Sequence, residues 1–261
     1  MELEQHREAL EAKGIKVAAV TYDSREILGR FAAQFSIGYP LLSDAESDVI
    51  RGFGILNDDM PEGSLFHGIP YPGNFLLGPD GRVLAKYFLP DYQTRPSASE
   101  ILARSFGTSG GPDVELRGDE VVARITLSDS QAVPGRQLGV TLDLSISDGW
   151  HLYGDPLPDA YQPLRIDFDD DLAADQSLEL PSPEPLRFEL LGETLPVHSG
   201  QLRGTGTLLV RSRLRPGSLA VKGELRYQAC QEESCGVPQA IRFEIPIEVI
   251  DQAPAIEPAS D

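Results

Sequence analysis

Apolar and polar residues follow two different patterns along this 261-residue chain. Up to residue 106, short apolar runs alternate with segments in which apolar residues recur every three or four positions. This alternation predicts strands interleaved with amphipathic helices. Beyond residue 112, apolar residues recur at every second position and Pro and Gly separate the runs, which predicts half-buried antiparallel strands. The pattern therefore predicts two domains, an α/β domain over residues 1–106 and an all-β sandwich over residues 113–250.

The α/β domain is predicted to begin with a helix that carries Leu3 and Leu10 on one face and ends at Gly14. Ser24 is a suitable N-cap for a second helix, because its hydroxyl can accept a hydrogen bond from a free N–H of the first turn. Gly78-Pro-Asp-Gly81 is a strong turn signal between two apolar runs and predicts a β-hairpin. The remaining predicted elements are strands at 16–22, 39–44, 73–77 and 82–88 and helices at 45–53 and 97–106.

The all-β domain is joined to the first by residues 107–112 (GTSGGP), whose small and φ-restricting residues predict a linker. Convincing helical spacing is absent from this half of the sequence. Residues 251–261 are rich in Pro, Ala and acidic residues, which predicts a disordered tail. Alternating residues predict strands at 121–127, 138–146, 186–191, 205–214, 219–227 and 241–250.

The chain is strongly acidic, with a net charge of −19 and an isoelectric point near 4.5. Residues 1–107 hold 10 basic and 15 acidic residues, a net −5, and the remainder hold 12 and 26, a net −14. Phosphate backbones and anionic lipid surfaces would repel such a chain, so neither nucleic acid nor a membrane surface is predicted as a partner. Solubility is the simplest interpretation of the acidity.

The N-terminal sequence MELEQH lacks the basic and apolar regions of a signal peptide. No run of about 18 consecutive apolar residues occurs, so membrane insertion is not predicted. Because the chain begins within a predicted helix that has no preceding cap, we expect the natural product to extend upstream of Met1.

Both cysteines of the chain lie five positions apart, at Cys230 and Cys235. A predicted strand runs into Cys230, and the four intervening residues are short enough to bring the two Cα atoms within the roughly 4.4–6.8 Å that a disulfide needs. Three interpretations remain open from the spacing: a reversible redox pair, a structural disulfide, and a metal site that would lack ligands. Glu232 and Glu233 lie between the sulfurs and should disfavour the thiolate.

Other candidate chemistry is sparse. The four histidines are scattered and are predicted to be satisfied surface or core residues, and the run Asp169–Asp171 is predicted to be solvated. The glycine-rich motifs of dinucleotide and nucleotide sites and the G-x-S-x-G motif of serine hydrolases are missing, so we predict no cofactor and no metal.

The segment Tyr227-Gln-Ala-Cys230, followed by Cys235-Gly-Val-Pro238, resembles the N-terminal extracytoplasmic domain of the thiol:disulfide interchange protein DsbD family, as does Gly149-Trp-His-Leu-Tyr153. The resemblance covers residues 113–250 and implies an immunoglobulin-like sandwich. It also implies that Cys230 and Cys235 accept electrons from a membrane-embedded reductant and pass them to proteins outside the cytoplasm. Gly236-Val-Pro238 departs from the more apolar and proline-rich pattern of many relatives. Three aromatic residues are candidates for packing around the pair, although core packing is the simpler role: Trp150, Tyr153 and Tyr227.

Residues 15–24 (IKVAAVTYDS) and 72–81 (PGNFLLGPDG) resemble the peroxiredoxin-type thioredoxin fold of the AhpC/TSA family. The resemblance implies that Pro72 occupies the position of the cis-proline that faces the active site in that fold. The reactive cysteine of the family precedes the first complete helix, whereas this chain has no cysteine before Cys230. The strand that leads to that cysteine is missing too, so two strands should face a gap.

Three functions are compatible with these features. The first is a thiol–disulfide exchange protein that passes electrons between Cys230/Cys235 and a protein partner. The second is a non-catalytic protein-binding module with a structural disulfide. The third is a fragment of a peroxiredoxin-like antioxidant enzyme whose reactive cysteine lies upstream of Met1. An extracytoplasmic location follows from the DsbD resemblance and from the persistence of disulfides in oxidising compartments.

Overall fold

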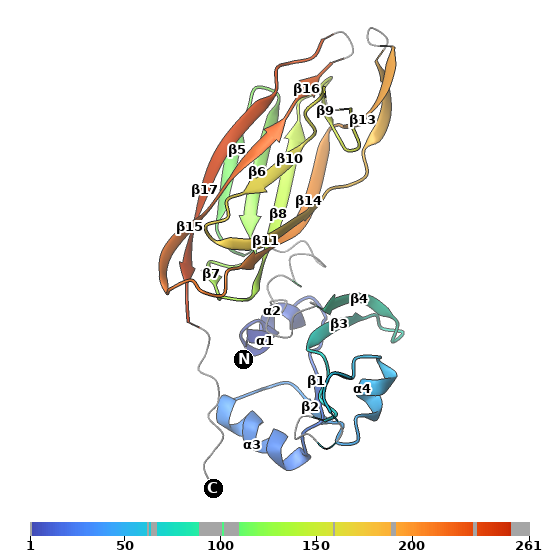
Figure 1. Ribbon diagram of the computed structural model, residues 1–261, viewed down its shortest axis with the longest axis vertical. Coiled ribbons are helices and arrows are strands. Elements are labelled where there is room, and N and C mark those ends of the chain that lie inside the picture. Colours follow the sequence, from blue (N-terminus) through green and yellow to red (C-terminus); the bar gives the residue numbers. More distant parts are fainter. Residues whose placement is uncertain are drawn as a thin grey trace. The chain divides into compact units, whose positions relative to one another are not determined.

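The computed structural model describes residues 2–61, 63, 67–88, 101, 110–158, 160–188, 192–231 and 234–251. The chain divides into two compact units, Met1–Ala98 and Ser99–Asp261 (Figure 1). The predicted helix at 97–106 lies outside the described residues except for Ile101, as do most of the predicted linker and all of the predicted tail after Asp251. In the described part of the chain, no helix has the length and apolar character needed to cross a bilayer.

Within its described residues the first unit contains most of the predicted helices and strands, but the single first helix that was predicted is divided into two short helices at His6. Ser24 caps its longest helix, and the Ser24 hydroxyl accepts a hydrogen bond from the Ile27 N–H at 3.3 Å. The helix ends at Ser36, which adopts the left-handed conformation at φ 52°. The elements in chain order are α1 (Glu2–Gln5), α2 (Arg7–Glu11), β1 (Ala19–Thr21), α3 (Arg25–Phe35), β2 (Leu41–Ser43), α4 (Asp48–Gly52), β3 (Gly73–Leu77) and β4 (Val83–Phe88).

The strands of the first unit form two separate sheets rather than one. β1 pairs with β2 in parallel, and β3 pairs with β4 in the predicted antiparallel hairpin. Few side chains of this unit are fully buried, whereas Val20, Leu42 and Leu84 are 40%, 49% and 65% exposed. Among its described residues, the buried hydrophobic side chains are Leu10, Leu28, Ile50 and Tyr87. Among the described residues, the two strand pairs do not hydrogen-bond to each other, and the core of this unit is thin.

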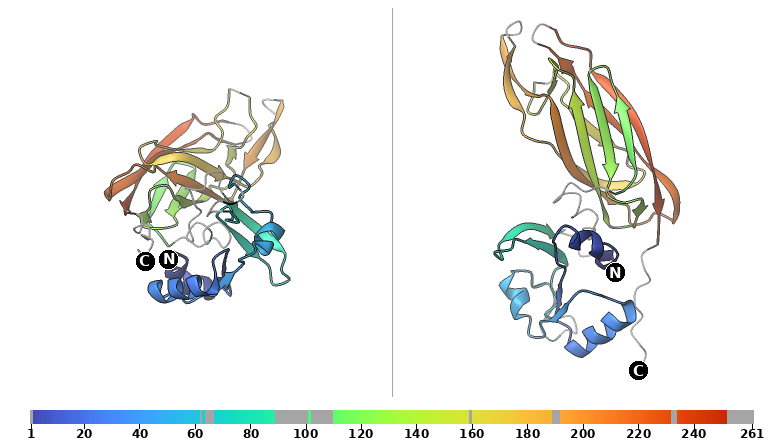
Figure 2. Two further views of the ribbon diagram at one scale, coloured as in Figure 1. Left: turned by 60° about the horizontal axis from the view of Figure 1, so that its bottom comes forward. Right: turned by 180° about the vertical axis from the view of Figure 1, so that it is seen from behind.

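The second unit is a β-sandwich with two main sheets (Figure 2), and one large hydrophobic core lies between them. One sheet has the order β11-β14-β8-β6-β5 and the facing sheet has the order β10-β15-β17-β7. The strands are β5 (Asp113–Arg117), β6 (Val121–Leu127), β7 (Gln131–Ala132), β8 (Gln137–Ile146), β9 (His151–Tyr153), β10 (Arg165–Phe168), β11 (Ala173–Glu179), β12 (Glu184–Phe188), β13 (Glu193–His198), β14 (Gln201–Val210), β15 (Gly217–Tyr227), β16 (Ala229–Cys230) and β17 (Gln239–Val249).

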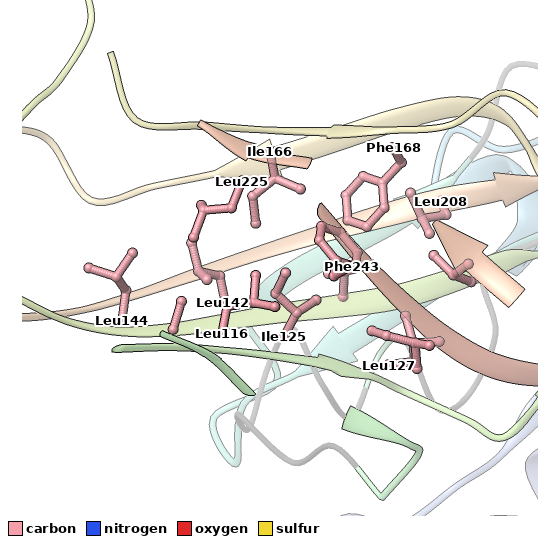
Figure 3. Packing of buried hydrophobic residues seen from close by; sticks show 14 of the residues in the cluster. Leu116, Ile125, Leu127, Leu142, Leu144, Ile166, Phe168, Leu208, Leu225 and Phe243 are labelled. Atoms are coloured by element: carbon pink, nitrogen blue, oxygen red, sulfur yellow. The ribbon is translucent and has the colours of Figure 1, made fainter. Parts of the chain in front are cut away.

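Alternation of side chains builds the large core. In β6 every second residue is buried, as expected for a strand with one face against the core. Ile125 and Leu142 from one sheet lie opposite Leu225 and Phe243 from the other (Figure 3). The ring of Phe243 also makes an edge contact with that of Phe168 at 5.7 Å between centroids. This packing supports the immunoglobulin-like sandwich class.

The six predicted strands correspond to β6, β8, β12, β14, β15 and β17. The prediction of a strand over 205–214 was wrong at its end, because β14 stops at Val210 and the Arg211 N–H donates to the Leu172 carbonyl. The sequence did not indicate β11, whose residues are mostly exposed and polar. The other strands that were not predicted are β5, β7, β9, β10, β13 and β16.

A third sheet, of order β12-β13-β9-β16, extends from the sandwich. It contains Cys230, and a second hydrophobic core lies on one of its faces. Leu152 and Ala229 on one face of this small sheet join the large core. Side chains of the other face form the second core, which consists of Tyr153, Phe188, Leu195, Val197 and Cys230.

Candidate functional site

Cys230 and Cys235 lie directly opposite each other in an antiparallel bridge. The Gly236 N–H donates to the Ala229 carbonyl and the Gln231 N–H donates to the Ser234 carbonyl, both at 2.8 Å. Because the bonds flank the pair and do not involve its own backbone groups, the cysteines form a non-hydrogen-bonded pair, in which Cα atoms are about 4.5 Å apart and side chains share one face. That spacing lies within the range for a disulfide. Both cysteines are free thiols in this structure.

The two thiols differ sharply in accessibility. Cys230 is completely buried in the second core, whereas Cys235 is exposed. A sulfur atom from another protein can therefore approach Cys235 but not Cys230. This asymmetry was not predicted from the spacing of the two residues.

Tyr153 connects the cysteine pair to the small sheet. Its hydroxyl lies 3.1 Å from Cys235 Sγ, and its side chain is fully buried. The Tyr153 ring makes an edge contact with Tyr161 at 5.0 Å and a tilted contact with Phe188 at 6.0 Å between centroids. The Tyr161 hydroxyl in turn donates to Glu193 at 3.0 Å. Aromatic packing thus fixes the hydroxyl beside the exposed sulfur.

Gln228 holds the backbone around the pair. The Gln228 side-chain amide donates to the Gly236 carbonyl at 3.0 Å and accepts a hydrogen bond from the Gln162 N–H at 3.1 Å. These bonds tie the 229–236 hairpin to residues 161–163. The sequence offered no signal for Gln228, because a glutamine in a loop is usually a solvated side chain.

Burial dominates the electrostatics of the site. Burial raises the pKa of the Cys230 thiol to about 12, and the hydrogen bond with Cys235 acts in the same direction. The Tyr153 hydroxyl and the Gly236 N–H oppose this rise, because each donates a hydrogen bond that favours the thiolate. Burial, followed by its bonds to the two thiols, raises the pKa of Tyr153 far above its ordinary value, so this residue is a neutral donor. The predicted influence of Glu232 and Glu233 concerns residues outside those described.

The other aromatic candidates lie elsewhere. Tyr227 is buried in the large core, where burial followed by the charges of Glu120 and Asp119 raises its pKa to about 12. Trp150 is half-buried against the same core. The alternation of β15 turns Tyr227 toward the large core, whereas Cys230 faces the second one. Of the three predicted aromatic neighbours, the structure brings Tyr153 to the cysteine pair.

Pro72 precedes β3 in the first unit. Asp155–Pro156 is the one cis peptide bond among the described residues, so the Tyr71–Pro72 bond is trans and lacks the geometry that the resemblance implies. Trans is the isomer that an X–Pro bond favours without specific surroundings. Residues 1–106 hold no cysteine for Pro72 to face.

The expectation that the histidines are satisfied is wrong for His151. Its Nδ1 atom is buried and has no hydrogen-bond partner. His198, in contrast, is a buried histidine whose pKa is lowered by burial alone. Across the described residues, no group of three or more His, Cys, Asp and Glu side chains is placed to hold a metal ion.

Comparison with known proteins agrees with the division of the chain. The model of the AhpC/TSA family matches residues 1–86, and the model of the N-terminal region of the thiol:disulfide interchange protein DsbD matches residues 123–246. Peroxiredoxin Bcp of Escherichia coli K12 and a putative peroxiredoxin bcp of Shigella flexneri are each 28% identical over 92 residues, which is 35% of this chain. The matched region spans 57% of the length of these relatives.

Two solved structures among those that match cover about half of this chain. The N-terminal periplasmic domain of ScsB from Proteus mirabilis is 13% identical with a TM-score of 0.40, covering 54% of this chain and 52% of that one. The reduced DsbD N-terminal domain of Neisseria meningitidis is 19% identical with a TM-score of 0.29, covering 52% and 87%. The first unit thus resembles AhpC/TSA proteins and the second resembles the N-terminal region of DsbD.

Proposed function

We propose that this protein exchanges disulfides with protein partners through Cys230 and Cys235. The observation that carries the proposal is the placement of the two sulfurs as a cross-strand pair with one member exposed and the other buried. An exposed sulfur can be attacked, and a buried neighbour within bonding range can resolve the resulting adduct. The match of residues 123–246 to the N-terminal region of a thiol:disulfide interchange protein supports the same chemistry.

The proposed reaction proceeds in two displacements. The Cys235 thiolate attacks a partner disulfide, so that a Cys235–partner bond forms and the second partner sulfur leaves as a thiolate that takes up a proton. Cys230, after losing its proton, attacks Cys235 Sγ, and the Cys230–Cys235 bond forms while the partner leaves as a dithiol. The pair loses two electrons and the partner gains them. The reverse sequence reloads the pair from a reductant.

Replacement of each cysteine tests the assignment of roles. With oxidised glutathione, Cys230→Ser should accumulate a stable glutathione adduct on Cys235, and the wild type should pass through the adduct to an internal disulfide. Cys235→Ser should remain unmodified because Cys230 is buried. Intact-protein mass spectrometry distinguishes these products, and equal labelling of the two single variants would contradict the assignment.

The reduction potential separates exchange from a structural disulfide. We expect equilibration with glutathione buffers to give a potential in the range of redox-active pairs. A value far below about −300 mV would place the bond among structural disulfides and would favour a purely binding role for the sandwich.

The match to the N-terminal region of DsbD supports a proposal for the partners and the compartment. We propose that a membrane-embedded reductant supplies electrons and that thiol-containing proteins outside the cytoplasm receive them. The solved ScsB domain is described as periplasmic, and a DsbD N-terminal domain of Neisseria meningitidis has been solved in complex with the N-terminal domain of PilB. Both statements concern those proteins and support the proposal by analogy.

A binding role is the second candidate, and it is favoured for the first unit. Peroxidase chemistry of the AhpC/TSA kind needs a thiolate, and residues 1–106 contain no cysteine. The double variant Cys230→Ser/Cys235→Ser distinguishes the two roles. Partner binding that survives in this variant, together with no exchange by the wild type, would favour the binding module.

A further inference from the structure

His151 lies directly across the small sheet from the buried cysteine. In the β9–β16 pairing, Cys230 is opposite His151 and Ala229 is opposite Leu152. Leu152 and Ala229 point into the large core, so the alternation of a strand places His151 on the other face, together with Tyr153 and Cys230. Directly opposite residues have Cβ atoms about 4.5–5.5 Å apart. The imidazole is thus the cross-strand neighbour of the Cys230 thiol.

The imidazole of His151 carries an unexplained polar atom. Its Nδ1 is buried and makes no hydrogen bond. Buried polar atoms are paired in the great majority of cases, because an unpaired one loses the hydrogen bonds that it makes with water. In the reduced state Nδ1 therefore bonds to neither thiol, and its burial is accounted for if a turn of the imidazole lets it accept a proton from Cys230 during turnover.

The proposed exchange reaction needs such a proton acceptor. Cys230 must become a thiolate before it attacks Cys235, yet it is completely buried and its pKa is raised to about 12. At neutral pH the unassisted thiol would therefore stay almost entirely protonated. Tyr153 cannot take the proton, since its own raised pKa keeps the hydroxyl neutral and donating.

We propose that His151 accepts the Cys230 proton during resolution of the mixed disulfide. The proton moves from Cys230 Sγ to the imidazole, the Cys230–Cys235 bond forms, the Cys235–partner bond breaks, and the departing partner thiolate takes up a proton. In the reverse direction the imidazolium returns its proton to Cys230 as that sulfur leaves. This step rests on the exchange function proposed above, and it assigns His151 as the base that accepts the Cys230 proton.

The titratable groups near His151 in the described part of the chain include Tyr161, whose ring contacts that of Tyr153 and whose hydroxyl donates to Glu193. Cys230 faces it from β16, Cys235 lies beyond Cys230, and Tyr153 shares its face of β9. Asp148 precedes it by three residues along the chain. His198 belongs to the adjoining strand β13, where it pairs with Leu152 and therefore lies on the opposite face. His198 is consequently a matched control, since it is a buried histidine of the same sheet that does not face the thiols.

A chromogenic disulfide separates the two chemical steps in the full-length protein. Attack of reduced Cys235 on dithiobis(nitrobenzoate) releases one coloured thiolate, and attack of Cys230 on the resulting adduct releases a second. Because the chain has only these two cysteines, the two phases are assigned without ambiguity. We expect His151→Gln to slow the second phase about 100-fold at neutral pH while the first phase changes little. His198→Gln should leave both phases unchanged.

The pH profile identifies the role of the imidazole. The second-phase rate of the wild type should level off once the imidazole is neutral, whereas that of His151→Gln should continue to rise with hydroxide. A second phase in His151→Gln that matches the wild type in rate and pH profile would overturn the inference. Equal slowing by His198→Gln would also overturn it, since that result indicates a structural effect.

Failure of the proposed function gives a different result. If the wild type releases no second thiolate, exchange itself is disproved, and the assignment of His151 falls with it. Should His151→Gln fail to fold, His151→Asn and the pH profile of the wild type provide the same comparison. A wild-type rate that rises with hydroxide throughout, with no levelling, would then contradict the proton-acceptor role.

Discussion

At the scale of single residues, Tyr153 couples the chemistry of the cysteine pair to the packing of the small sheet. Its ring is held by Tyr161 and Phe188, and its hydroxyl lies 3.1 Å from Cys235 Sγ. A neutral hydroxyl that donates to a thiolate stabilises the charged form. The same hydroxyl lowers the pKa of Cys230, against the larger effect of burial. Tyr153 therefore contributes to both displacements.

Removal of that hydroxyl should slow the first displacement. We predict that Tyr153→Phe decreases the rate of Cys235 alkylation by iodoacetamide about tenfold at neutral pH, because a hydrogen bond to a charged group contributes roughly 1.5–3 kcal/mol. Tyr161→Phe is the matched control, since its hydroxyl bonds to Glu193 and its ring remains in contact with Tyr153. Equal rates in the two variants would show that the Tyr153 hydroxyl has no role at the sulfur.

At the scale of elements, the edge strand β16 carries the site, and the large sheets give it a rigid base. β16 pairs with β9, and β9 pairs with β13, so the cysteine pair lies at the open end of the small sheet. The five-stranded sheet depends on glycines where β11 approaches β14. A Cβ on Gly206 would overlap the Ser177 carbonyl oxygen, which is a backbone atom that cannot move alone.

Alanine at this glycine should therefore weaken the sandwich without altering its chemistry. We predict that Gly206→Ala lowers the free energy of unfolding by about 1–3 kcal/mol, as overpacking does elsewhere. Gly204→Ala on the same strand should cost less, because its Cβ would meet chiefly the Leu180 Cδ2 atom at 2.6 Å, the end of a flexible side chain. Urea unfolding measures both variants, and a larger loss for Gly204→Ala would contradict this account of the β11–β14 pairing.

At the scale of the whole molecule, the two units differ in how much apolar surface they bury. Both hydrophobic clusters belong to the second unit, whereas the described part of the first buries four hydrophobic side chains and leaves Val20, Leu42 and Leu84 exposed. Burial of apolar area is the main stabilising contribution to a fold. We infer that the first unit is the less stable of the two.

Calorimetry of the full-length protein should show this difference in stability. It should also show which of the two units the disulfide stabilises. We predict two thermal transitions, of which the lower belongs to the first unit. Formation of the Cys230–Cys235 bond should raise the temperature of the upper transition only. We expect it to increase the free energy of unfolding of the second unit by about 2 kcal/mol, because closing so short a loop removes little chain entropy. A single transition that moves as a whole on oxidation would contradict the assignment.

Much of the fold was predictable because it depends on local patterns. The predicted strand at 121–127 coincides with β6, the hairpin about Gly78-Pro-Asp-Gly81 forms, and Ser24 caps α3 as expected. The polar strand β11 was missed, since its pairing with β14 rather than its own pattern makes it a strand. The match of each half to a different family likewise follows motifs that are visible in the sequence.

The sequence by itself determined that the two cysteines could pair, because four intervening residues after a strand are few enough for a hairpin. Only the tertiary structure decided which sulfur is buried, which aromatic residue contacts the pair and which histidine faces it. Tyr153 is 82 residues from Cys235 along the chain, and Phe188 and Leu195 come from other strands of the small sheet. Spacing in sequence fixes local geometry, whereas burial and proton affinity depend on side chains that only strand pairing brings together.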